Sequence, residues 1–441
     1  MPNKDVFCNS PWYELHIFWD GSFGYCCQQT PHRPYVEHLA SFYNIKTMAI
    51  SDWHTSKPMN ASRLAMFSDD KMSNCDKCWY QERFSSTSRR RKANSKSVLF
   101  KQAFDVSFEQ SPNYDTFESS FDNGGETTQM PLDFHIDLGN YCNLACKFCC
   151  PDASSKIASQ YKKWDVLGNE SIVSDWTKND DVWDSFIAQI MHMDLQNIHL
   201  MGGETLITPR FEDLVDALIE NERYEVCISF VTNGTSFNKP LMDKLKNFKR
   251  VGIEVSIETL TEHNEYIRQG TKNSVVIGNI NRYIDLAKDS TIDITIRPAL
   301  SLLSIGYYHT LLEFCLDKRV LLKSNNVIGE VGWKSSKCLD VRLLPTDVKT
   351  SYKKHYVELL NTIDAELLIE DFNESDSNNY KNVIRDECHK CIALLDSEVD
   401  HDLYPDLVEL LEKWDKVYEL NAIELYPELS ELLLEHNYNV N

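Results

Sequence analysis

From residue 133 onward, short apolar runs alternate with longer stretches in which apolar residues recur at helical spacing. The apolar runs predict five strands, at residues 134–138, 198–201, 226–231, 251–257 and 292–296. The helical patterns predict helices between them, at residues 182–193, 211–221, 240–248 and 275–287. Strands separated by helices form right-handed βαβ units around a parallel sheet. A sixth strand near residues 327–331 would give six units, too few for a closed eight-unit barrel. The pattern therefore predicts an α/β fold with a partial (β/α)6 barrel of the TIM type.

The segments on either side of this barrel have different patterns. The N-terminal segment combines a β-type run at residues 15–19, a turn at Asp20-Gly21 and a helical stretch near residues 62–71. This mixture predicts a small cysteine-bearing α+β module. An acidic segment without hydrophobic periodicity follows it, as expected of a linker. We expect four parts: the module at residues 1–100, the linker at 101–130, the barrel at 131–345 and an acidic helical extension at 346–441.

The charge balance restricts the class of partner. The 441 residues include 45 Lys and Arg against 67 Asp and Glu, which gives a net charge of -22. Such a chain repels nucleic-acid phosphates, so we expect no nucleic-acid partner and favour a neutral or basic one. No apolar run is long enough to span a bilayer, and the first ten residues lack the pattern of a secretory signal. We therefore expect a cytoplasmic protein with no membrane association.

The 14 cysteines are clustered rather than spread along the chain. In a reducing compartment, clustered thiols usually ligate metal or act in redox chemistry. Cys142, Cys146 and Cys149 have the spacing C-x3-C-x2-C directly after the first predicted barrel strand, at the end where such barrels build active sites. Three thiolates can hold three irons of a [4Fe-4S] cluster and leave the fourth iron open. A zinc site is the alternative, in which Cys150 would have to supply the fourth ligand.

This motif resembles the signature of the radical S-adenosylmethionine (SAM) superfamily, C-x3-C-x-aromatic-C after the first strand of a partial barrel. Phe148 stands at the aromatic position. The resemblance implies that Cys142, Cys146 and Cys149 hold a catalytic [4Fe-4S] cluster, whose open iron binds the amino and carboxylate groups of SAM. It also implies that the backbone around Phe148 lies near the adenine.

Further motifs of the same superfamily follow the next strands. Gly202, Gly203 and Glu204 come directly after the second strand, where glycines allow close approach of the backbone and a carboxylate can accept from an ammonium. By resemblance, this G-G-E motif binds the amino group of SAM. The resemblance further implies that Ser256, after the fourth strand, contacts SAM and that Arg268 binds its carboxylate. Many relatives have Asp where Glu258 stands here.

A second group of cysteines lies in the N-terminal module: Cys8, then Cys26 five residues after Gly21, and a C-x2-C pair at Cys75 and Cys78. A hairpin that turns at Asp20-Gly21 would bring Cys8 and Cys26 together on paired strands. Four thiols suit zinc or an iron-sulfur cluster, and Cys27 is an alternative to Cys26 as a ligand.

The spacing C-x12-G-x4-C with later cysteines resembles the SPASM domain and its truncated form, the twitch domain. These domains hold auxiliary [4Fe-4S] clusters in radical SAM enzymes that mostly modify peptides or proteins. Relatives usually carry the module after the barrel, whereas here it precedes the barrel. Four well-placed cysteines favour a single auxiliary cluster, as in the twitch form.

The resemblances together imply a radical SAM enzyme. A low-potential donor, such as a flavodoxin or ferredoxin, would supply the electron that cleaves SAM reductively. The 5′-deoxyadenosyl radical would then abstract hydrogen from a substrate, most often a peptide or protein in SPASM and twitch enzymes. The alternatives are a twitch-type dehydrogenase of a small carbohydrate and, more remotely, a non-catalytic iron-sulfur or zinc scaffold.

Two smaller features leave alternatives open. Cys388 and Cys391 form a late C-x2-C, which on a helix would share one face. They are expected to pack in the core, with metal ligation or redox exchange as the alternative. The basic run that starts at Arg89 is expected in a solvated loop, with a carboxylate contact as the alternative.

Overall fold

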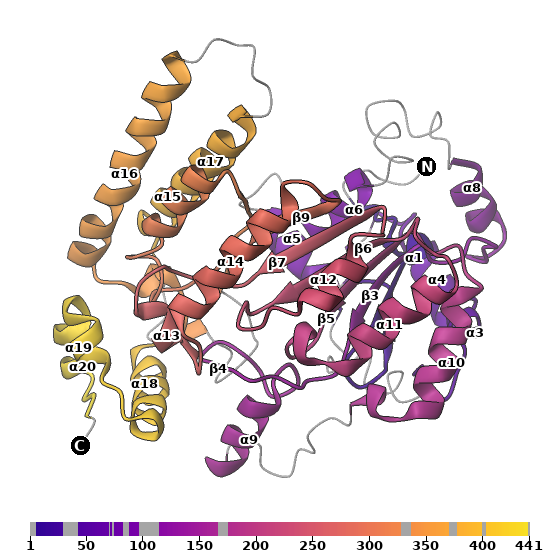
Figure 1. Ribbon diagram of the computed structural model, residues 1–441, viewed down its shortest axis with the longest axis horizontal. Coiled ribbons are helices and arrows are strands. Elements are labelled where there is room, and N and C mark those ends of the chain that lie inside the picture. The colour runs from indigo at the N-terminus through magenta and orange to yellow at the C-terminus, as the bar shows by residue number, and fades with distance from the viewer. Residues whose placement is uncertain are drawn as a thin grey trace.

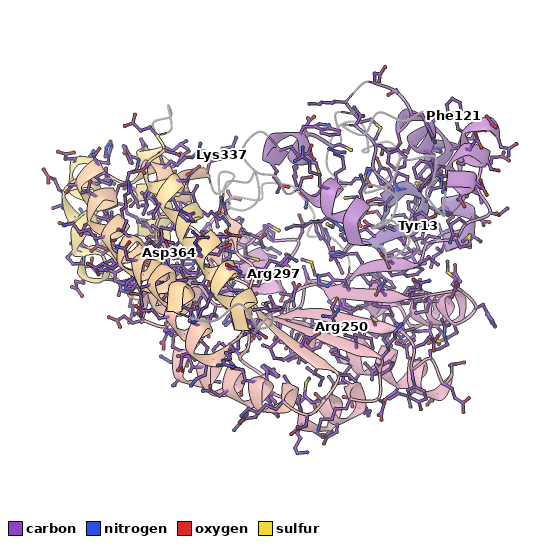
Figure 2. All side chains as sticks on the ribbon, turned by 90° about the horizontal axis from the view of Figure 1, so that it is seen from above. Tyr13, Phe121, Arg250, Arg297, Lys337 and Asp364 are labelled. Atoms are coloured by element: carbon purple, nitrogen blue, oxygen red, sulfur yellow. The ribbon has the colours of Figure 1, made fainter. Side chains whose placement is uncertain are left out.

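The computed structural model describes residues 6–29, 43–69, 71–72, 75–82, 88–96, 114–165, 175–327, 337–369, 377–398 and 403–439. Figure 1 shows a central sheet with a row of helices against one face. The N-terminal helices lie at one end of this sheet. The C-terminal helices lie at the other, as the positions of Tyr13 and Asp364 in Figure 2 also show.

One eight-stranded sheet forms the centre of the molecule. In spatial order, its strands are β11 (Leu321–Leu322), β9 (Ile292–Ile296), β7 (Arg250–Val255), β6 (Cys227–Thr232), β5 (Asn197–Met201), β3 (Asp133–Asp137), β1 (Glu14–Ile17) and β2 (Phe23–Gly24). The neighbours from β11 to β1 pair in parallel, and only the β1–β2 pair of this sheet is antiparallel. The six strands from β3 to β11 follow one another in sequence order across the sheet. This arrangement confirms a partial TIM-type α/β fold.

The helices between these strands cover the apolar face of the sheet. They are α10 (Asp180–Met191), α11 (Pro209–Glu220), α12 (Lys239–Leu245), α14 (Asn273–Ala287) and α15 (His309–Lys318). In β6 every second residue is buried, and the ring of Phe230 lies 4.9 Å from that of Phe211 in α11. The side chains of Asn179 and Asn238 accept the backbone N–H groups that open α10 and α12. Each such cap contributes about 1 kcal/mol to helix stability.

The sixth strand lies earlier than the sequence predicts. Its place in the sheet is taken by β11, at residues 321–322, which pairs with β9. Of the predicted strand at residues 327–331, only Val327 is among the described residues, and it belongs to no strand. The apolar run that ends the barrel is only a few residues long, so its hydrophobicity does not distinguish it from the loop that follows.

The N-terminal module contributes a strand to the barrel sheet. The predicted hairpin is present, since β1 and β2 pair on either side of the turn at Gly21. In addition, β1 pairs in parallel with β3 over four residues. Cys8 lies before helix α1 (Ser10–Tyr13) and Cys26 lies beyond β2, so the expectation that the hairpin places both on paired strands is wrong. The turn fixes only the residues next to it, whereas both cysteines lie outside the short ladder.

The remaining N-terminal helices pack around β1. They are α3 (Ile50–His54), α4 (Lys57–Ala65), α5 (Asp76–Glu82), α6 (Arg89–Lys96) and α8 (Tyr114–Asp122). Helix α8 lies inside the segment expected as a linker, and its Phe117 is fully buried 5.0 Å from the ring of Trp12. Residues 101–113 lie outside the described residues. No clear periodicity in the sequence marks α8, because a helix of nine residues needs only a few apolar residues to form a buried face.

The basic run is part of a helix and not of a solvated loop. Arg90 in α6 is buried, and its guanidinium donates to both carboxylate oxygens of Glu82, at 2.7 and 3.0 Å. Arg89 donates to Glu14 of β1 at 2.7 Å. The carboxylate contact that the sequence left open is therefore the one that forms.

The C-terminal extension is helical, as predicted. It contains α16 (Thr346–Ile369), α17 (Ser377–Leu395), α18 (Tyr404–Tyr418), α19 (Ala422–Leu425) and α20 (Ser430–Glu435). Cys388 and Cys391 lie on α17 and are fully buried, so they share a face that packs in the core. None of the helices that the structure describes combines the length and apolar composition needed to cross a membrane.

Short elements connect these layers. They are β4 (Ala145–Cys146), β8 (Arg268–Gln269), β10 (Ala299–Leu300), β12 (Asn325–Asn326), α9 (Ser155–Lys163), α13 (His263–Ile267) and 3-10 turns at Trp176–Lys178, Thr205–Ile207, Val341–Leu343 and Pro427–Leu429. Of these, β4 and β8 pair with each other in antiparallel fashion.

Candidate active site

The loops after β3, β5, β6 and β7 meet at the carboxyl edge of the parallel sheet. The three-cysteine motif lies in the loop after β3, and its middle residue, Cys146, forms part of β4. Because β4 pairs with β8, Cys146 stands opposite Arg268. A pairing between two short strands therefore brings together a cysteine and an arginine that are 122 residues apart.

The three cysteines of this loop lie in a poorly solvated environment. Burial raises the pKa of Cys146 to about 12 and also raises the pKa of Cys142 and Cys149. The negative charges of Cys150, Cys146 and Cys142 raise the pKa of Cys149 further, so these thiols lie close together. Thiolates so placed are stable only when a positive charge compensates them, as the irons of a cluster would.

The two glycines after β5 are required by close packing. Gly202 has a φ of +136°, and a Cβ on Gly203 would lie 2.1 Å from the carbonyl oxygen of Tyr141. The backbone N–H of Gly203 donates to Gly139, and that of Glu204 donates to Tyr141 at 2.8 Å. The G-G-E motif therefore packs directly on the backbone that leads into the three-cysteine loop.

The Glu204 carboxylate is buried, and its hydrogen bonds connect the loop after β5 to the end of β6. It accepts from the Thr232 hydroxyl at 2.6 Å, from the backbone N–H of Asn233 at 2.6 Å and from that of Leu206 at 3.1 Å. Burial raises its pKa, while these hydrogen bonds oppose the shift. Three donors leave part of the carboxylate's acceptor capacity for a further donor, such as an ammonium.

An asparagine pair links the end of β6 to the three-cysteine loop. Asn233 Nδ2 donates to Asn143 Oδ1 at 2.8 Å, and Asn143 Nδ2 donates to Thr235 Oγ1 at 2.9 Å. Asn233 and Thr235 follow the end of β6, and no local pattern indicates that Asn143, between two of the cysteines, is their partner. That contact depends on the path of the loop.

Arg268 forms a buried ion pair with Glu258. Its guanidinium donates two hydrogen bonds to the carboxylate, one of them at 2.7 Å. Its third nitrogen, Nη1, lies 3.7 Å from Cys146 Sγ, and the guanidinium lies 5.5 Å from the ring centre of Phe148. Glu258 is therefore the partner of Arg268 in this structure, and the arginine places positive charge beside the cysteines.

Ser256 lies at the end of β7, beside the end of β6. Its backbone N–H donates to Thr232 at 2.8 Å, and its side chain is half-buried. Ser256, Glu204 and the ends of β6 and β7 are therefore adjacent.

Sequence reasoning missed a buried lysine in the middle of the cysteine motif. Lys147 Nζ donates to the Tyr266 carbonyl at 2.9 Å and lies 3.6 Å from the centre of the Tyr266 ring. It also lies 5.8 Å from the ring of Trp414 in α18. Burial lowers the pKa of Lys147 to about 7, although Asp415 favours the charged form. The C-terminal extension thus packs against the three-cysteine loop, a contact that local sequence does not reveal.

Four cysteines of the N-terminal module lie near one another. Burial raises the pKa of Cys75 to about 12 and that of Cys8 to about 11. Beyond burial, the charges of Cys8 and Cys78 raise the pKa of Cys75, and the charge of Cys27 raises the pKa of Cys78. Because these thiols affect one another's pKa, their side chains form one group.

The structure distinguishes the adjacent Cys26 and Cys27. A hydrogen bond from the Cys26 thiol, followed by the charge of Arg89, lowers the pKa of Cys27 well below its usual value. The hydrogen bond to Cys27 and burial raise the pKa of Cys26. Within this hydrogen-bonded pair, Cys27 is the thiol that bonds to Arg89 and whose charge acts on Cys78.

Two family models match the chain in these two regions. One is described as the radical SAM superfamily and matches residues 136–301. The other is described as an iron-sulfur cluster-binding domain, SPASM, and matches residues 8–79. The chain therefore contains a radical SAM domain and a SPASM domain. Its SPASM domain precedes the radical SAM domain, and its cofactors are a catalytic [4Fe-4S] cluster, SAM and an auxiliary cluster.

Two solved structures are similar to part of this chain. Streptococcus suis SuiB bound to S-adenosylmethionine is 16% identical with a TM-score of 0.39, over 59% of this chain and 56% of that one. Native anSMEcpe with bound AdoMet is 18% identical with a TM-score of 0.37, over 53% of this chain and 62% of that one. The chain thus spans about three fifths of the length of these structures. Among curated proteins, none matches the sequence.

The residues of this radical SAM domain fit the cofactors of its family. The loop offers three thiols and an adjacent guanidinium, in surroundings where thiolates need a compensating cation. The G-G-E motif beside it presents a buried carboxylate with acceptor capacity to spare. The individual ligands remain predictions.

Proposed function

We propose that this radical SAM enzyme cleaves SAM reductively and abstracts a hydrogen atom from a peptide or protein substrate. The observation that carries the proposal is the direct contact between the three-cysteine loop and the Gly202-Gly203-Glu204 turn. A closed structural metal site has no need of a carboxylate and two close-packed glycines beside it.

Each residue of the site then has a specific role. Cys142, Cys146 and Cys149 hold the catalytic cluster, and Glu204 accepts from the ammonium of SAM. The backbone of the two glycines keeps the turn close to the cysteine loop. When bound, the cluster and SAM supply the radical that attacks an unactivated C–H bond.

The remaining predicted contacts hold the other parts of SAM. Ser256 and the backbone near Phe148 lie beside the nucleoside, and Arg268 binds the carboxylate. Arg268 already pairs with Glu258, so the SAM carboxylate must compete for its donors or share them. Glu258 also cancels the arginine's charge in the absence of SAM.

The SPASM domain is proposed to be of the twitch type, with one auxiliary [4Fe-4S] cluster. Its ligands are Cys8, Cys75, Cys78 and either Cys26, as the family spacing implies, or Cys27. The contact of Cys27 with Arg89 and its effect on Cys78 support Cys27. The auxiliary cluster would bind the substrate or accept an electron from the product radical.

The proposed partners follow from charge and chemistry. A net charge of -22 suits a neutral or basic polypeptide better than an acidic one. The catalytic cluster needs a low-potential electron donor, such as a flavodoxin or ferredoxin. Both partners, and a cytoplasmic location, are part of the proposal, as are the domain limits at residues 100, 130 and 345.

The catalytic proposal is tested by reconstituting the protein anaerobically with iron and sulfide and then adding dithionite and SAM. We expect 5′-deoxyadenosine from the wild type and from Cys150→Ala, but none from Cys142→Ala, Cys146→Ala or Cys149→Ala. Cys150 is the matched control because it adjoins the motif without belonging to it. Formation of deoxyadenosine by any of the three variants would overturn the ligand assignment. A colourless protein with zinc and no iron would favour the scaffold alternative.

The substrate class is tested by isotope transfer. The reconstituted enzyme is incubated with SAM and a deuterated peptide pool, or with a deuterated carbohydrate pool, and the deoxyadenosine is analysed by mass spectrometry. Deuterium from the peptide pool alone supports the proposal. Deuterium from the carbohydrate pool alone would favour the dehydrogenase alternative.

A further inference from the structure

Three histidines lie side by side on neighbouring strands of the sheet. His16 of β1 pairs in register with His135 of β3, which pairs with His199 of β5. The residues next to these histidines along each strand lie on the apolar face of the sheet that the helices cover. Phe230 of β6 lies on this face and contacts α11. Because side chains alternate along a strand, the histidines point to the opposite, inner face of the barrel.

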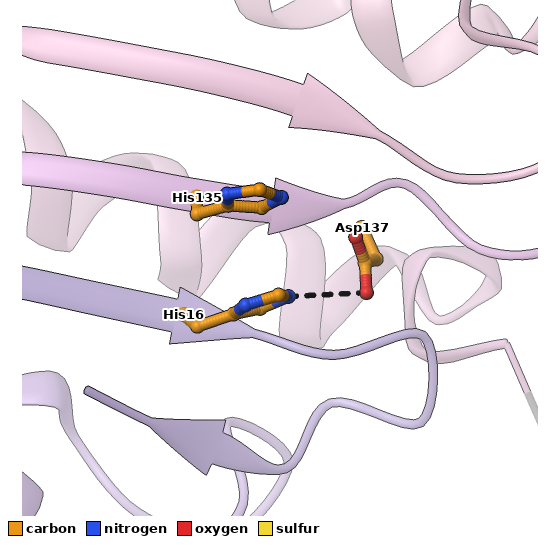
Figure 3. A group of neighbouring side chains, drawn as sticks. All are labelled: His16, His135 and Asp137. Atoms are coloured by element: carbon orange, nitrogen blue, oxygen red, sulfur yellow. Dashed lines mark hydrogen bonds and ion pairs between the residues drawn. The ribbon is translucent and has the colours of Figure 1, made fainter. Parts of the chain in front are cut away.

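Two of these histidines converge on a carboxylate. His16 Nε2 lies 3.1 Å from Oδ2 of Asp137, two residues after His135 on β3. The rings of His16 and His135 are stacked, with their centres 4.3 Å apart. Figure 3 shows both rings directed toward Asp137. One donor atom from each of the three residues lies within 4.8 Å of the others.

The Asp137 carboxylate of this group has little compensation for its negative charge. Asp137 is only 5% exposed, and within the part of the chain that the structure describes its carboxylate has a single hydrogen-bond partner, His16. A buried carboxylate is costly unless a positive charge or several donors compensate it. A bound cation would supply that charge.

The Nε2 atom of His135 is accessible to a metal ion in this arrangement. The nearest partner of its Nε2 is the Met201 sulfur at 2.9 Å, which is a weak acceptor and competes little for the nitrogen.

We propose that His16, His135 and Asp137 bind a divalent transition-metal ion, with ligands other than those of the two iron-sulfur clusters. Two imidazoles and one carboxylate suit Zn²⁺ and also Fe²⁺. Ligands at about 2.1 Å around a tetrahedral ion lie about 3.4 Å apart. The His16 and Asp137 atoms, 3.1 Å apart, already have nearly this spacing, and the other pairs lie within 4.8 Å. Three protein ligands leave one position open for an oxygen or nitrogen of a substrate.

The location gives this site a structural consequence. His16 belongs to the segment matched by the SPASM domain, whereas Asp137 belongs to the radical SAM domain. A shared ion would join β1 to β3 and thereby link the two domains at the inner face of the barrel.

The test uses the full chain reconstituted with iron and sulfide, incubated with zinc sulfate and freed of excess metal. Zinc and iron per chain are then counted by mass spectrometry. We expect one zinc in the wild type, and at least a tenfold weaker zinc affinity in Asp137→Asn and in His16→Gln with the iron content unchanged. The matched control is His199→Gln, which alters the third histidine of the row and should keep the zinc.

Two comparisons make the result decisive. Because the auxiliary cysteines could also bind zinc, the count is repeated in Cys75→Ser/Cys78→Ser, where the histidine site should still hold one zinc. Absence of zinc from the wild type, or its retention in both His16→Gln and Asp137→Asn, would overturn the proposal. If one variant fails to fold, the other decides. Since the readout is bound zinc, failure of SAM cleavage would not affect it.

Discussion

At the scale of single residues, the site combines groups that need compensation with neighbours that supply it. Glu204 is a buried carboxylate with three donors, and Arg268 is a buried guanidinium with Glu258. The cysteines of the loop have raised pKa values, and Nη1 of Arg268 lies 3.7 Å from Sγ of Cys146. The carboxylate and the thiols of the site are therefore suited to groups of positive charge, and the guanidinium is suited to a group of negative charge.

Replacing Glu204 should weaken SAM binding without loss of iron. In Glu204→Gln, the amide removes the negative charge and directs N–H groups at the donors of Thr232 or Asn233. We expect SAM affinity to fall at least tenfold in anaerobic equilibrium dialysis. Thr232→Val, which removes one donor to the carboxylate, should have a smaller effect. Unchanged affinity in Glu204→Gln would contradict the ammonium contact.

A methyl group at Gly203 should disrupt the junction between β5 and the cysteine loop. Its Cβ would lie 2.1 Å from a backbone oxygen that cannot move independently of the loop. We expect Gly203→Ala to lose several kcal/mol of stability and to retain little catalytic-cluster iron. The control is Gly278→Ala in α14, where nothing lies within 4 Å of the new Cβ and helix propensity should add up to about 1 kcal/mol. Urea denaturation and iron analysis measure both effects.

At the scale of elements, helices distant in sequence hold the catalytic loop. The ring of Trp414 in α18 lies 4.6 Å from that of Trp164, just after α9, and 6.3 Å from that of Tyr161. The same indole lies over Lys147 of the cysteine loop. The C-terminal extension thus stabilises the loop on the side away from the sheet.

Removal of this indole should loosen the loop. Trp414→Ala deletes a fully buried side chain, which costs about 3–5 kcal/mol. We expect lower stability in urea and faster loss of iron to a chelator than in the wild type. Val417→Ala, at an exposed position of the same helix, should change neither. Equal chelation rates in Trp414→Ala and the wild type would show that α18 does not support the loop.

The contact between α3 and α4 should make the N-terminal module sensitive to acid. Burial and the charge of Arg63 lower the pKa of His54 to about 3. Between pH 6.5 and 3 the unfolded state therefore binds a proton that the folded state does not, so stability falls as the pH falls, by at most about 1.4 kcal/mol per pH unit. We expect His54→Gln to lose less stability than the wild type between pH 7 and pH 5 in urea denaturation. Exposed His192→Gln should behave as the wild type does.

At the scale of the whole molecule, one sheet unites two domains that each carry a cysteine cluster. Strand β1 of the SPASM domain extends the barrel sheet beside β3, the strand that leads into the catalytic loop. Within the module, an ion pair between Arg89 and Glu14 joins α6 to β1. The order of domains along the chain is unusual for this family, and β1 is the element that couples them.

The two-cluster arrangement predicts how iron divides between the domains. Cys75→Ser/Cys78→Ser should lose about half of the iron and still form deoxyadenosine in the absence of substrate, because the catalytic loop is intact. The matched control is Cys388→Ala/Cys391→Ala, the other C-x2-C pair, which is buried in α17 and should keep its iron. Full iron content in the first variant would contradict the auxiliary site.

The sequence by itself determined the parallel barrel, because the alternation of strand and helix depends on local hydrophobic periodicity. It also indicated the three-cysteine motif and the G-G-E motif, whose short spacing needs only a strand and a turn to bring their members together. These features are local, and their physical causes act within about ten residues of one another.

Only the tertiary structure decided which distant residues meet. The pairing of β1 with β3, of Cys146 with Arg268 and of Lys147 with Trp414 depends on how separate elements pack, and no local pattern encodes it. The same holds for β11, which is too short to be distinguished by hydrophobicity, and for α6, whose charges are satisfied by Glu82 and Glu14. Register across the sheet, which is fixed by packing of the whole apolar face, brought His16, His135 and Asp137 together.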